Sequence, residues 1–247
     1  MTDEAHDRLD KVLVLRGIIS SRTRAQALIK EGKVSVNGGV VTESDHPVRE
    51  NDAVLLAGPD HPWVSRGGLK LDHALRHFRI DPRGKVTLDI GAGTGGFTDV
   101  LLAHGAAKVY ALDVGHDQLV DKIKNDPRVV NMEGMHVNAV HKADFAEPID
   151  LAVIDVSFIS LTKILPKVHE LLSPEGVVIA LVKPQFEVGR ENVGKGVIKD
   201  DMLHVRVIHD VTECAKALGF IVSTAVDSPI LGGDGNKEFL LLLEMSK

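Results

Sequence analysis

The chain has 247 residues and a net charge of −6, and 44% of its residues are hydrophobic while 26% are charged. This length can hold one large domain or a small module joined to a medium-sized one, and the composition is ordinary for a globular protein. No run reaches the roughly 18 apolar residues of a membrane-spanning helix, and the net negative charge argues against indiscriminate binding of nucleic acids.

The start of the chain and its single cysteine indicate the compartment. MTDEAHDRLD is acidic and polar, whereas a secretory signal has a basic end followed by an apolar segment. With Cys214 alone, no disulfide bond can form within the chain, which fits a reducing environment. We expect a cytoplasmic protein.

The first forty residues predict a small unit built from two helices and a hairpin. Apolar residues with helical spacing begin at Leu9, and Ser21 is a suitable N-cap for a second helix that Gly32 would end. Two alternating valines then lead into Asn37-Gly38, which is the strongest short signal for a β-hairpin. We therefore expect the order helix, turn, helix, hairpin.

Positive charge is concentrated in this small unit. Between residues 8 and 40, seven lysines and arginines stand against two acidic residues, and the rest of the chain is correspondingly acidic. The basic residues are Arg8, Lys11, Arg16, Arg22, Arg24, Lys30 and Lys33. Their clustering weighs against a merely solvated charged face.

A domain boundary is expected near residue 60. The stretch DAVLLAG (52–58) predicts one more strand, and GPDHPW after it is rich in turn residues. We accordingly expect a first domain over residues 1–60, a linker over 61–66 and a second domain over 67–247. From Val86 onward, strand-like apolar runs alternate with helical patterns, which predicts an α/β fold with a doubly wound sheet.

A glycine-rich turn predicts a cofactor site. In LDIGAGTGGFT (88–98), Asp89 ends a strand and four glycines fill the turn that opens the next helix, which allows a ligand to approach the backbone closely. Asp113 ends the following strand, where a carboxylate can accept both hydroxyls of an adenosine ribose. NAD enzymes share this feature, but the D-x-G-x-G-x-G spacing differs from the dinucleotide fingerprint and suits S-adenosylmethionine.

Charged residues at strand ends predict a second part of the same site. Asp155 closes LAVID and Lys183 closes VVIALV, and the carboxyl ends of parallel strands lie along one edge beside the ligand crevice. Glu238 precedes the strand FLLLLEM, so it reaches that edge only if this strand runs antiparallel. A lone strand-end lysine is usually an exposed residue paired with an acid, but the convergence of two acids and one lysine favours function.

Three other features favour a structural interpretation or exclude a reaction. Cys214 falls within a predicted helix (201–218), which favours a packed cysteine over a nucleophile for carbon methylation of pyrimidines. After LAVID the chain continues DVSF rather than the Asn/Asp-Pro-Pro-aromatic sequence of amino-group methyltransferases. His73 and His77 have the spacing of a metal pair, but no third ligand is evident, so a solvated pair is favoured and no metal is expected.

Nearly the whole chain resembles one of two known families. RLDKVLVLRGIISSRTRAQALIKEGKVSVNG resembles the S4-type RNA-binding domain, and VSRGGLKL, DIGAGTGGFT, IDVSFISL, LVKPQFEVGRENVGKG and SPILGGDGNKEFLL resemble the bacterial TlyA family, whose members are also called hemolysins. The resemblance implies a Rossmann-like methyltransferase sheet of the FtsJ type, mostly parallel with one antiparallel strand, after a small α+β S4 domain. It also implies S-adenosylmethionine as cofactor and 2'-O-methylation of a ribose, that of cytidine, in 23S or 16S ribosomal RNA.

The resemblance assigns roles to particular residues. A Lys-Asp-Lys-Glu catalytic set falls on Lys70, Asp155, Lys183 and Glu238, and we assign Lys183 as the general base, which requires a neutral amine. Lys70 rests on the resemblance alone, because it otherwise reads as a helix-surface lysine after a Gly-Gly turn. The expected cofactor-binding residues are Asp89, Gly91, Ala92, Gly93, Thr94, Gly96, Phe97 and Asp113, with Asn138 and Asp144 as candidates for adenine contacts.

The partner implied by the resemblance is ribosomal RNA or a ribosomal subunit. The seven basic residues of the small unit are expected to contact phosphates, which makes binding salt-dependent. The loop 189–199 is expected to close over RNA, and Trp63 is a candidate for stacking on a base. The short ends of the chain resemble the compact branch of the family, for which large-subunit RNA is the expected substrate. The family commonly has Ser where this chain has Gly93.

Two other functions stay open at this point. A non-catalytic ribosome-binding assembly factor would keep the fold without binding S-adenosylmethionine, and the intact strand-end charges disfavour it. A membrane-lytic hemolysin would lyse red cells, and the lack of a signal or of a long apolar segment disfavours it. No membrane, metal or oligomer is implied.

Overall fold

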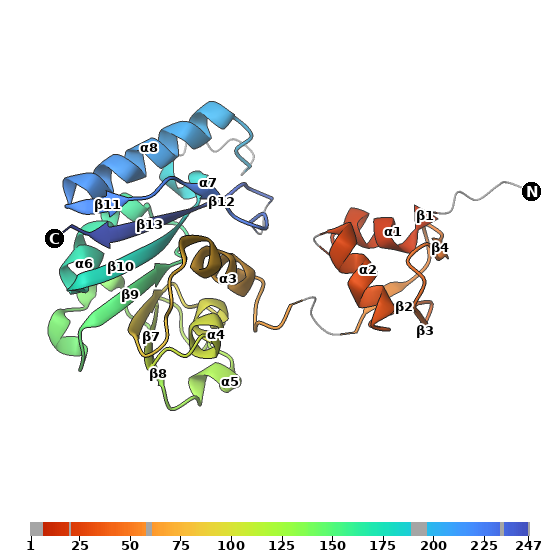
Figure 1. Cartoon of the computed structure of the whole chain (residues 1–247), viewed down its shortest axis with the longest axis horizontal. Coiled ribbons are helices and arrows are strands. Elements are labelled where there is room, and N and C mark those ends of the chain that lie inside the picture. Colours follow the sequence, from red (N-terminus) through yellow and green to blue (C-terminus); the bar gives the residue numbers. More distant parts are fainter. Residues whose placement is uncertain (1–6, 20, 58–60, 189–196, 233–234, 247) are drawn as a thin grey trace, which may run out of the picture. The chain divides into compact units, whose positions relative to one another are not determined.

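The structure, a computed structural model, describes residues 7–19, 21–57, 61–188, 197–232 and 235–246. The chain forms two compact units, Met1–Pro62 and Trp63–Lys247. Figure 1 shows the helices and strands of each unit. The division lies close to the boundary expected near residue 60.

The small unit packs two helices and a three-stranded antiparallel sheet around one apolar cluster. Its elements are α1 (Leu9–Leu15), α2 (Arg22–Lys30), the sheet β3 (Gly39–Val41), β2 (Val34–Val36) and β5 (Val54–Leu56), and the pair β1 (Asp7–Arg8) and β4 (Pro47–Val48). The cluster includes Leu9, Leu13, Leu28, Ile29 and Val34. The predicted order of helix, turn, helix and hairpin is confirmed.

Side chains of the two turns explain this local structure. Ser21 Oγ accepts a hydrogen bond from Arg24 N at 3.3 Å, which caps α2. Asn37 adopts a φ of 50° in the hairpin, its Oδ1 accepts from Ala53 N at 2.9 Å, and its Nδ2 donates to Asp52 Oδ1 at 2.8 Å. The hairpin turn is thereby tied to the segment that leads into β5.

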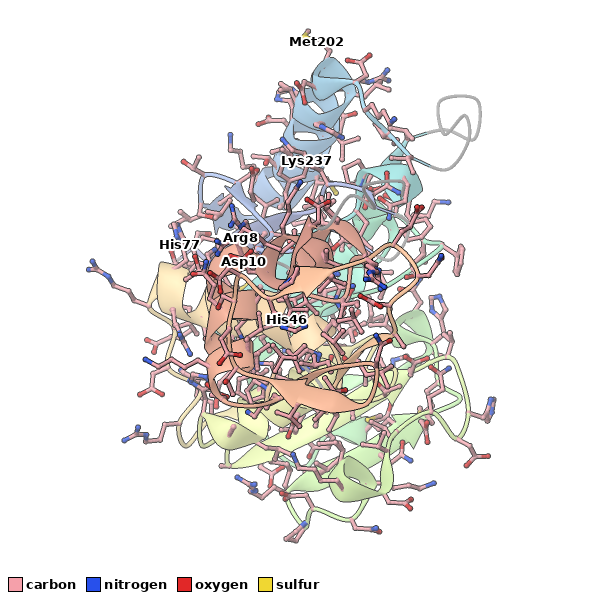
Figure 2. All side chains as sticks on the ribbon, turned by 90° about the vertical axis from the view of Figure 1, so that its right-hand side faces the viewer. Arg8, Asp10, His46, His77, Met202 and Lys237 are labelled. Atoms are coloured by element: carbon pink, nitrogen blue, oxygen red, sulfur yellow. The ribbon has the colours of Figure 1, made fainter. Side chains whose placement is uncertain are left out.

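A buried carboxylate, that of Asp10, organises the surface of the small unit. The guanidinium of Arg8 donates to both carboxylate oxygens at 3.1 and 3.2 Å, and Arg22 and Gln26 donate to Oδ2 at 2.9 and 2.8 Å. Figure 2 shows Arg8 and Asp10 side by side. Burial alone would raise the pKa of Asp10, but these hydrogen bonds outweigh burial and hold that pKa well below its usual range.

A mixed, mostly parallel sheet forms the centre of the large unit. The strands lie in the order β11, β13, β10, β9, β6, β7, β8, and β12 pairs with β13. Their bounds are β6 (Val86–Ile90), β7 (Lys108–Asp113), β8 (Val129–Glu133), β9 (Ile149–Ile154), β10 (Leu172–Val182), β11 (Phe220–Val222), β12 (Val226–Asp227) and β13 (Phe239–Met245). The five adjacent strands β8, β7, β6, β9 and β10 are parallel to one another, whereas β13 runs antiparallel to β10. The predicted α/β class with one antiparallel strand beside a parallel sheet is confirmed.

Helices cover both faces of this sheet (Figure 1). One apolar cluster joins the sheet to α3 (Gly67–Phe78), α4 (Gly96–Ala103) and α5 (Asp121–Lys124), and another joins it to α6 (Leu165–Leu171) and α8 (Asp201–Ala217). Successive residues of β9 enter opposite clusters, because strand side chains alternate between faces: Leu151 and Val153 enter the first, and Ala152 and Ile154 the second. The central strands are therefore apolar throughout, as the sequence indicates.

Short elements depart from the sequence-based expectations. The Gly-Gly pair lies inside the first turn of α3 rather than before the helix. Strand β8 was not predicted, because it forms the edge of the sheet and only Met132 in it is fully buried. Pro184 opens a one-turn helix, α7 (Pro184–Glu187), at a position where proline loses no hydrogen bond. Single 3-10 turns are η1 (Val137–Ala139), η2 (Lys142–Asp144) and η3 (Leu161–Lys163).

Among the helices described, none is both long and apolar enough to cross a bilayer.

Replacing Asp10 should loosen the small unit selectively. Asp10→Ala removes a carboxylate that accepts charged hydrogen bonds, and we expect a loss of about 2–3 kcal/mol of local stability. Hydrogen exchange of the full-length protein would show faster exchange in α1 and α2 and unchanged exchange in the large unit. Asp7→Asn is the control, because Asp7 is half-exposed and, among the residues that the structure describes, forms an ion pair with Lys11 only. Equal exchange in both variants would contradict a central role for Asp10.

Candidate active site

The turn after β6 brings the ends of three strands into contact. Gly91 has a φ of +86°, and a Cβ atom at this position would lie 2.6 Å from the carbonyl oxygen of Asp155. Gly91 N donates to Leu112 O at 2.8 Å, and Asp155 N donates to Ile90 O at 2.9 Å. No side chain fits at position 91, so the ends of β6, β7 and β9 approach each other closely.

Asp113, at the end of β7, is fixed by the same turn. Its Oδ2 accepts a hydrogen bond from Gly93 N at 2.8 Å, and its Oδ1 accepts one from Gly115 N at 2.7 Å. An ionised carboxylate offers about four acceptor positions, so each oxygen can accept one more hydrogen bond. The side chain is thus oriented in advance and still able to accept from two hydroxyl groups, such as those of a ribose.

Asp89 lies beneath the turn, fully buried. Its Oδ2 accepts a hydrogen bond from the hydroxyl of Thr98 at 2.7 Å, while Oδ1 has no hydrogen-bond partner among the described residues. Burial, with smaller contributions from the charges of Asp155 and Asp113, raises the pKa of Asp89 to about 7, although Thr98 opposes the shift. Asp89 therefore supports the turn and holds a proton over much of the range below neutral pH.

Two ion pairs stand at the carboxyl edge of the sheet. Lys183, directly after β10, places Nζ 2.7 Å from Asp155 Oδ1 and donates to Ser157 Oγ at 3.1 Å. Lys70, on α3, places Nζ 2.5 Å from Glu238 Oε2, and Glu238 directly precedes the antiparallel β13. All four charged side chains are at least four-fifths buried. Burial strengthens the Coulomb attraction within such a pair but costs the hydration of both ions, and removing one partner leaves an uncompensated buried charge.

Two cavities meet at Asp155. One, of about 680 Å³, is lined by Asp113 and is called the Asp113 cavity here; the other, of about 460 Å³, is lined by Lys70 and is called the Lys70 cavity. Both are lined by Gly91, Gly93 and Asp155. Among the predicted cofactor-binding residues, those that line at least one cavity are Gly91, Ala92, Gly93, Thr94, Gly96, Phe97 and Asp113, whereas Asp89 is buried below.

The two candidates for adenine contacts lie elsewhere. Asn138 and Asp144 are exposed and line neither cavity, and the carboxylate of Asp144 accepts a hydrogen bond from His141 N at 2.7 Å. The Asp113 cavity is lined instead by Met135, His136 and Val137. These three closely follow β8. Because ligands bind beside the carboxyl ends of parallel strands, recognising this edge strand in the sequence would have indicated them as cofactor contacts.

Aromatic side chains differ from expectation in their exposure. Trp63 packs against Gly68, where a Cβ atom would lie 2.5 Å from Trp63 Cγ, and against the ring of His104 at a centroid distance of 6.5 Å. Trp63 is half-buried, so these contacts give it a packing role, and its stacking on a base stays a prediction. Phe158, which sequence reasoning missed, lines the Asp113 cavity, is 91% exposed and has a φ of +65°. Only residues 197–199 of the expected closing loop 189–199 fall within the described ranges.

Several of the seven basic residues have partners within the small unit. Arg8 and Arg22 contact Asp10, and Lys11 and Lys33 form exposed ion pairs with Asp7 and Glu31. The guanidinium of Arg16 donates to the carbonyl oxygens of Asp52, Arg49 and Glu50 at 2.7, 3.0 and 2.8 Å. Lys30 is exposed at the last turn of α2. The side chains of this group thus have structural roles beyond a shared positive charge.

Cys214 and the pair His73 and His77 lie on helices. Cys214 lies in α8, as predicted, with Sγ 3.8 Å from Thr162 O. The rings of His73 and His77 stack at 6.0 Å. Within the described part of the chain, no group of three or more His, Cys, Asp or Glu side chains is arranged to hold a metal ion.

Sequence models of two families match the chain. The FtsJ-like methyltransferase family matches residues 63–245, and the S4 domain matches residues 7–54. The two matches fall on the two structural units.

Curated relatives cover most of the chain. The 16S/23S rRNA (cytidine-2'-O)-methyltransferase TlyA of Mycobacterium tuberculosis is 41% identical over 96% of this chain and 89% of its own length. Hemolysin A of Brachyspira hyodysenteriae is 43% identical over 94% of this chain and 98% of its own. The 23S rRNA (cytidine-2'-O)-methyltransferase TlyA of Campylobacter jejuni is 36% identical over 72% and 69%.

Solved structures also resemble this chain, at different levels of identity. A hemolysin-labelled protein of Streptococcus thermophilus is 42% identical, covers 99% of this chain and 90% of its own, and superposes with a TM-score of 0.76. An S-adenosylmethionine-dependent methyltransferase of Mesorhizobium loti, 18% identical with a TM-score of 0.52 over 70% of this chain and 99% of its own, shares the fold alone.

The raised pKa of Asp89 predicts a pH dependence of stability. An unfolded Asp titrates near about 4, so between about pH 4 and pH 7 the folded chain binds more protons than the unfolded one and the free energy of unfolding falls as pH rises. In Asp89→Asn this component should vanish. The difference between wild type and variant, measured by denaturant unfolding at pH 5 and pH 7, should change by about 2 kcal/mol. Parallel curves would contradict the buried, protonated state.

Proposed function

This chain belongs to the TlyA family, in which an S4 domain is joined to an FtsJ-like methyltransferase domain, and we propose that it methylates the 2'-hydroxyl of a cytidine ribose in ribosomal RNA. The observation that carries the proposal is the pair of buried ion pairs, Lys183–Asp155 and Lys70–Glu238, at the junction of two cavities. Large-subunit RNA is the proposed substrate, since the Campylobacter jejuni relative is named for 23S rRNA and the Mycobacterium tuberculosis relative for both.

The cavities fit S-adenosylmethionine. Asp113 can accept the ribose hydroxyls, and the absence of a side chain at Gly91 leaves the backbone of the turn open to a ligand. Met135 and Val137 offer apolar contacts in the Asp113 cavity for the adenine ring. When bound, the cofactor supplies an activated methyl group on a sulfonium. Asp155, which both cavities share, marks the position where the two substrates would meet.

The reaction needs alignment and the removal of one proton. Lys183 Nζ would accept the proton of the ribose 2'-hydroxyl as its oxygen bonds the methyl group and the S–CH3 bond of the sulfonium breaks to leave a thioether, so Lys183 must be neutral when it acts. Asp155 and Ser157 hold Nζ in one position through contacts of 2.7 and 3.1 Å. Lys70 and Glu238 form a second fixed pair beside the Lys70 cavity and would orient the RNA ribose. Alignment of this kind can lower a barrier by several kcal/mol.

The small unit would supply affinity for RNA. Its net positive charge between residues 8 and 40 favours contacts to phosphates, and such contacts weaken as salt concentration rises. Arg8 and Arg22 are held by Asp10 in fixed positions while their side chains stay about half exposed. A guanidinium that is already ordered loses less conformational freedom when it binds a phosphate.

Replacing Lys183 tests the function directly. Purified protein, S-adenosylmethionine and unmodified ribosomal subunits should yield a new 2'-O-methylcytidine in mapped ribosomal RNA. In Lys183→Ala the rate of transfer should fall about 10²–10⁴-fold, because proton removal is lost. Lys216→Ala is the matched control, since Lys216 also pairs with an acid but lies on the exposed face of α8. An unchanged map with the wild-type protein, on subunits of either size, would refute the proposal.

Phe158 is the proposed stacking residue for the target base. A stacked base is worth about 1–3 kcal/mol, so Phe158→Ala should raise KM for RNA about 5–100-fold. Phe158→Trp keeps an aromatic face and should behave nearly as wild type. If Phe158→Ala and Phe158→Trp show the same KM for RNA, Phe158 does not stack on the substrate.

A further inference from the structure

Two loops at the carboxyl edge of the sheet carry the central ion pair, and they touch at a first point near the cavities. The β9 loop, defined here as residues 155–163, contains Asp155 and Ser157, and the β10 turn, defined as residues 183–187, contains Lys183 and α7. At this first point Lys183 Nζ contacts Asp155 and Ser157 at 2.7 and 3.1 Å.

The same two loops are joined at a second point by Glu187. Glu187 Oε2 accepts a hydrogen bond from the hydroxyl of Ser160 at 2.5 Å, and Oε1 accepts one from Leu161 N at 2.8 Å. Ser160 Oγ in turn accepts from Thr162 N at 3.2 Å, which caps η3. Burial raises the pKa of Glu187 while these two hydrogen bonds oppose the rise. Burial makes the charged carboxylate less stable, and the hydrogen bonds from Ser160 and Leu161 offset this and hold the side chain in place.

Between the two points the β9 loop is strained. Phe158 adopts a φ of +65°, a region that side chains other than glycine rarely occupy, and its ring lies 5.0 Å from that of Phe186. Phe186 also lies under Lys183, whose Nζ is 5.9 Å from the ring centroid. Such a backbone conformation persists only where the surroundings enforce it. The contacts at both ends of the loop provide that enforcement.

We propose that Glu187 is a positioning residue for methyl transfer: it clamps the β9 loop to the β10 turn and so fixes Asp155 and Ser157 against Lys183 Nζ. The inference rests on the proposed function. Glu187, Ser160 and Leu161 line neither cavity, so Glu187 acts through the loop and touches no substrate. A displacement of about 1 Å at reacting groups can cost about 10²-fold in rate. The β9 loop also lines the Asp113 cavity, but Asp113 and the glycine-rich turn, which would anchor S-adenosylmethionine, belong to other strands. Loosening the clamp should therefore weaken cofactor binding less than it slows methyl transfer.

Four variants test the clamp. Glu187→Ala should lower kcat about 10–100-fold, with a smaller change in KM for S-adenosylmethionine. Glu187→Gln keeps the acceptor for Leu161 N, and its amide can donate to Ser160 Oγ, so kcat should recover to within about threefold of wild type. Ser160→Ala should show an intermediate loss. The double variant Glu187→Ala/Ser160→Ala should lose less activity than the two single losses combined, because both remove the Ser160–Glu187 contact, although Ser160→Ala also removes the cap of η3.

A matched control and a readout without activity complete the test. Glu213→Ala removes an exposed glutamate of α8 that bonds Lys216, and it should leave kcat unchanged. Hydrogen exchange of residues 155–163 should rise in Glu187→Ala while exchange of residues 86–96 stays at the wild-type rate. This measurement stands even if the wild-type protein methylates no 2'-hydroxyl, in which case the proposed function fails and the clamp itself is still judged.

Three results would overturn the inference. One is a folded Glu187→Ala variant with wild-type kcat. Another is a loss in Glu187→Gln as large as in Glu187→Ala, which would mean that charge rather than hydrogen bonding matters. The third is a loss of S-adenosylmethionine binding as large as the loss in kcat in all variants, which would indicate general destabilisation. If Glu187→Ala fails to fold, Ser160→Ala and Glu187→Gln decide the question by kcat alone.

Discussion

The register of three neighbouring strands determines the geometry of the active site. Parallel pairing sets Ala180 opposite Ile154, and antiparallel pairing sets Val182 opposite Phe239. The residues that flank these strands are therefore delivered to one edge of the sheet, where they form the ion pairs described above. A slip by one residue would turn every side chain of a strand to the opposite face. Because both faces are packed with apolar side chains, the energy that stabilises the core also fixes the positions of the charges.

Sequence patterns predicted the parts of the site that depend on strand ends. Asp155 and Lys183 were indicated by their places after apolar runs, and Glu238 required only that the last strand be antiparallel, which the structure confirms. Lys70 was different, because its pairing with Glu238 joins a helix to a strand far along the chain, and no local pattern records such a contact. Its importance came from family resemblance.

Other features were missed or misjudged for identifiable physical reasons. The edge strand β8 buries too few side chains to show an alternating or continuous apolar pattern, so the residues after it were not considered for the cofactor. Trp63 packs against a glycine of the following helix, a contact that its residue type does not reveal. The clamp by Glu187 depends on a contact across 26 residues of chain. Tertiary contacts of this kind decide which polar residues are free to act.

Two glycines of the cofactor turn differ in whether a side chain would fit in their place. At Gly91 a side chain would meet the backbone of Asp155, so this position is closed to substitution in any sequence that keeps the strand ends together. At Gly93 the nearest atom to an added Cβ is Gln118 Oε1, at 3.9 Å, and the backbone φ of +50° can be met by a small residue at a cost of about 1–2 kcal/mol. Within one turn, the backbone of a neighbouring strand therefore excludes any side chain at position 91, whereas a small side chain such as that of serine can be accommodated two residues later.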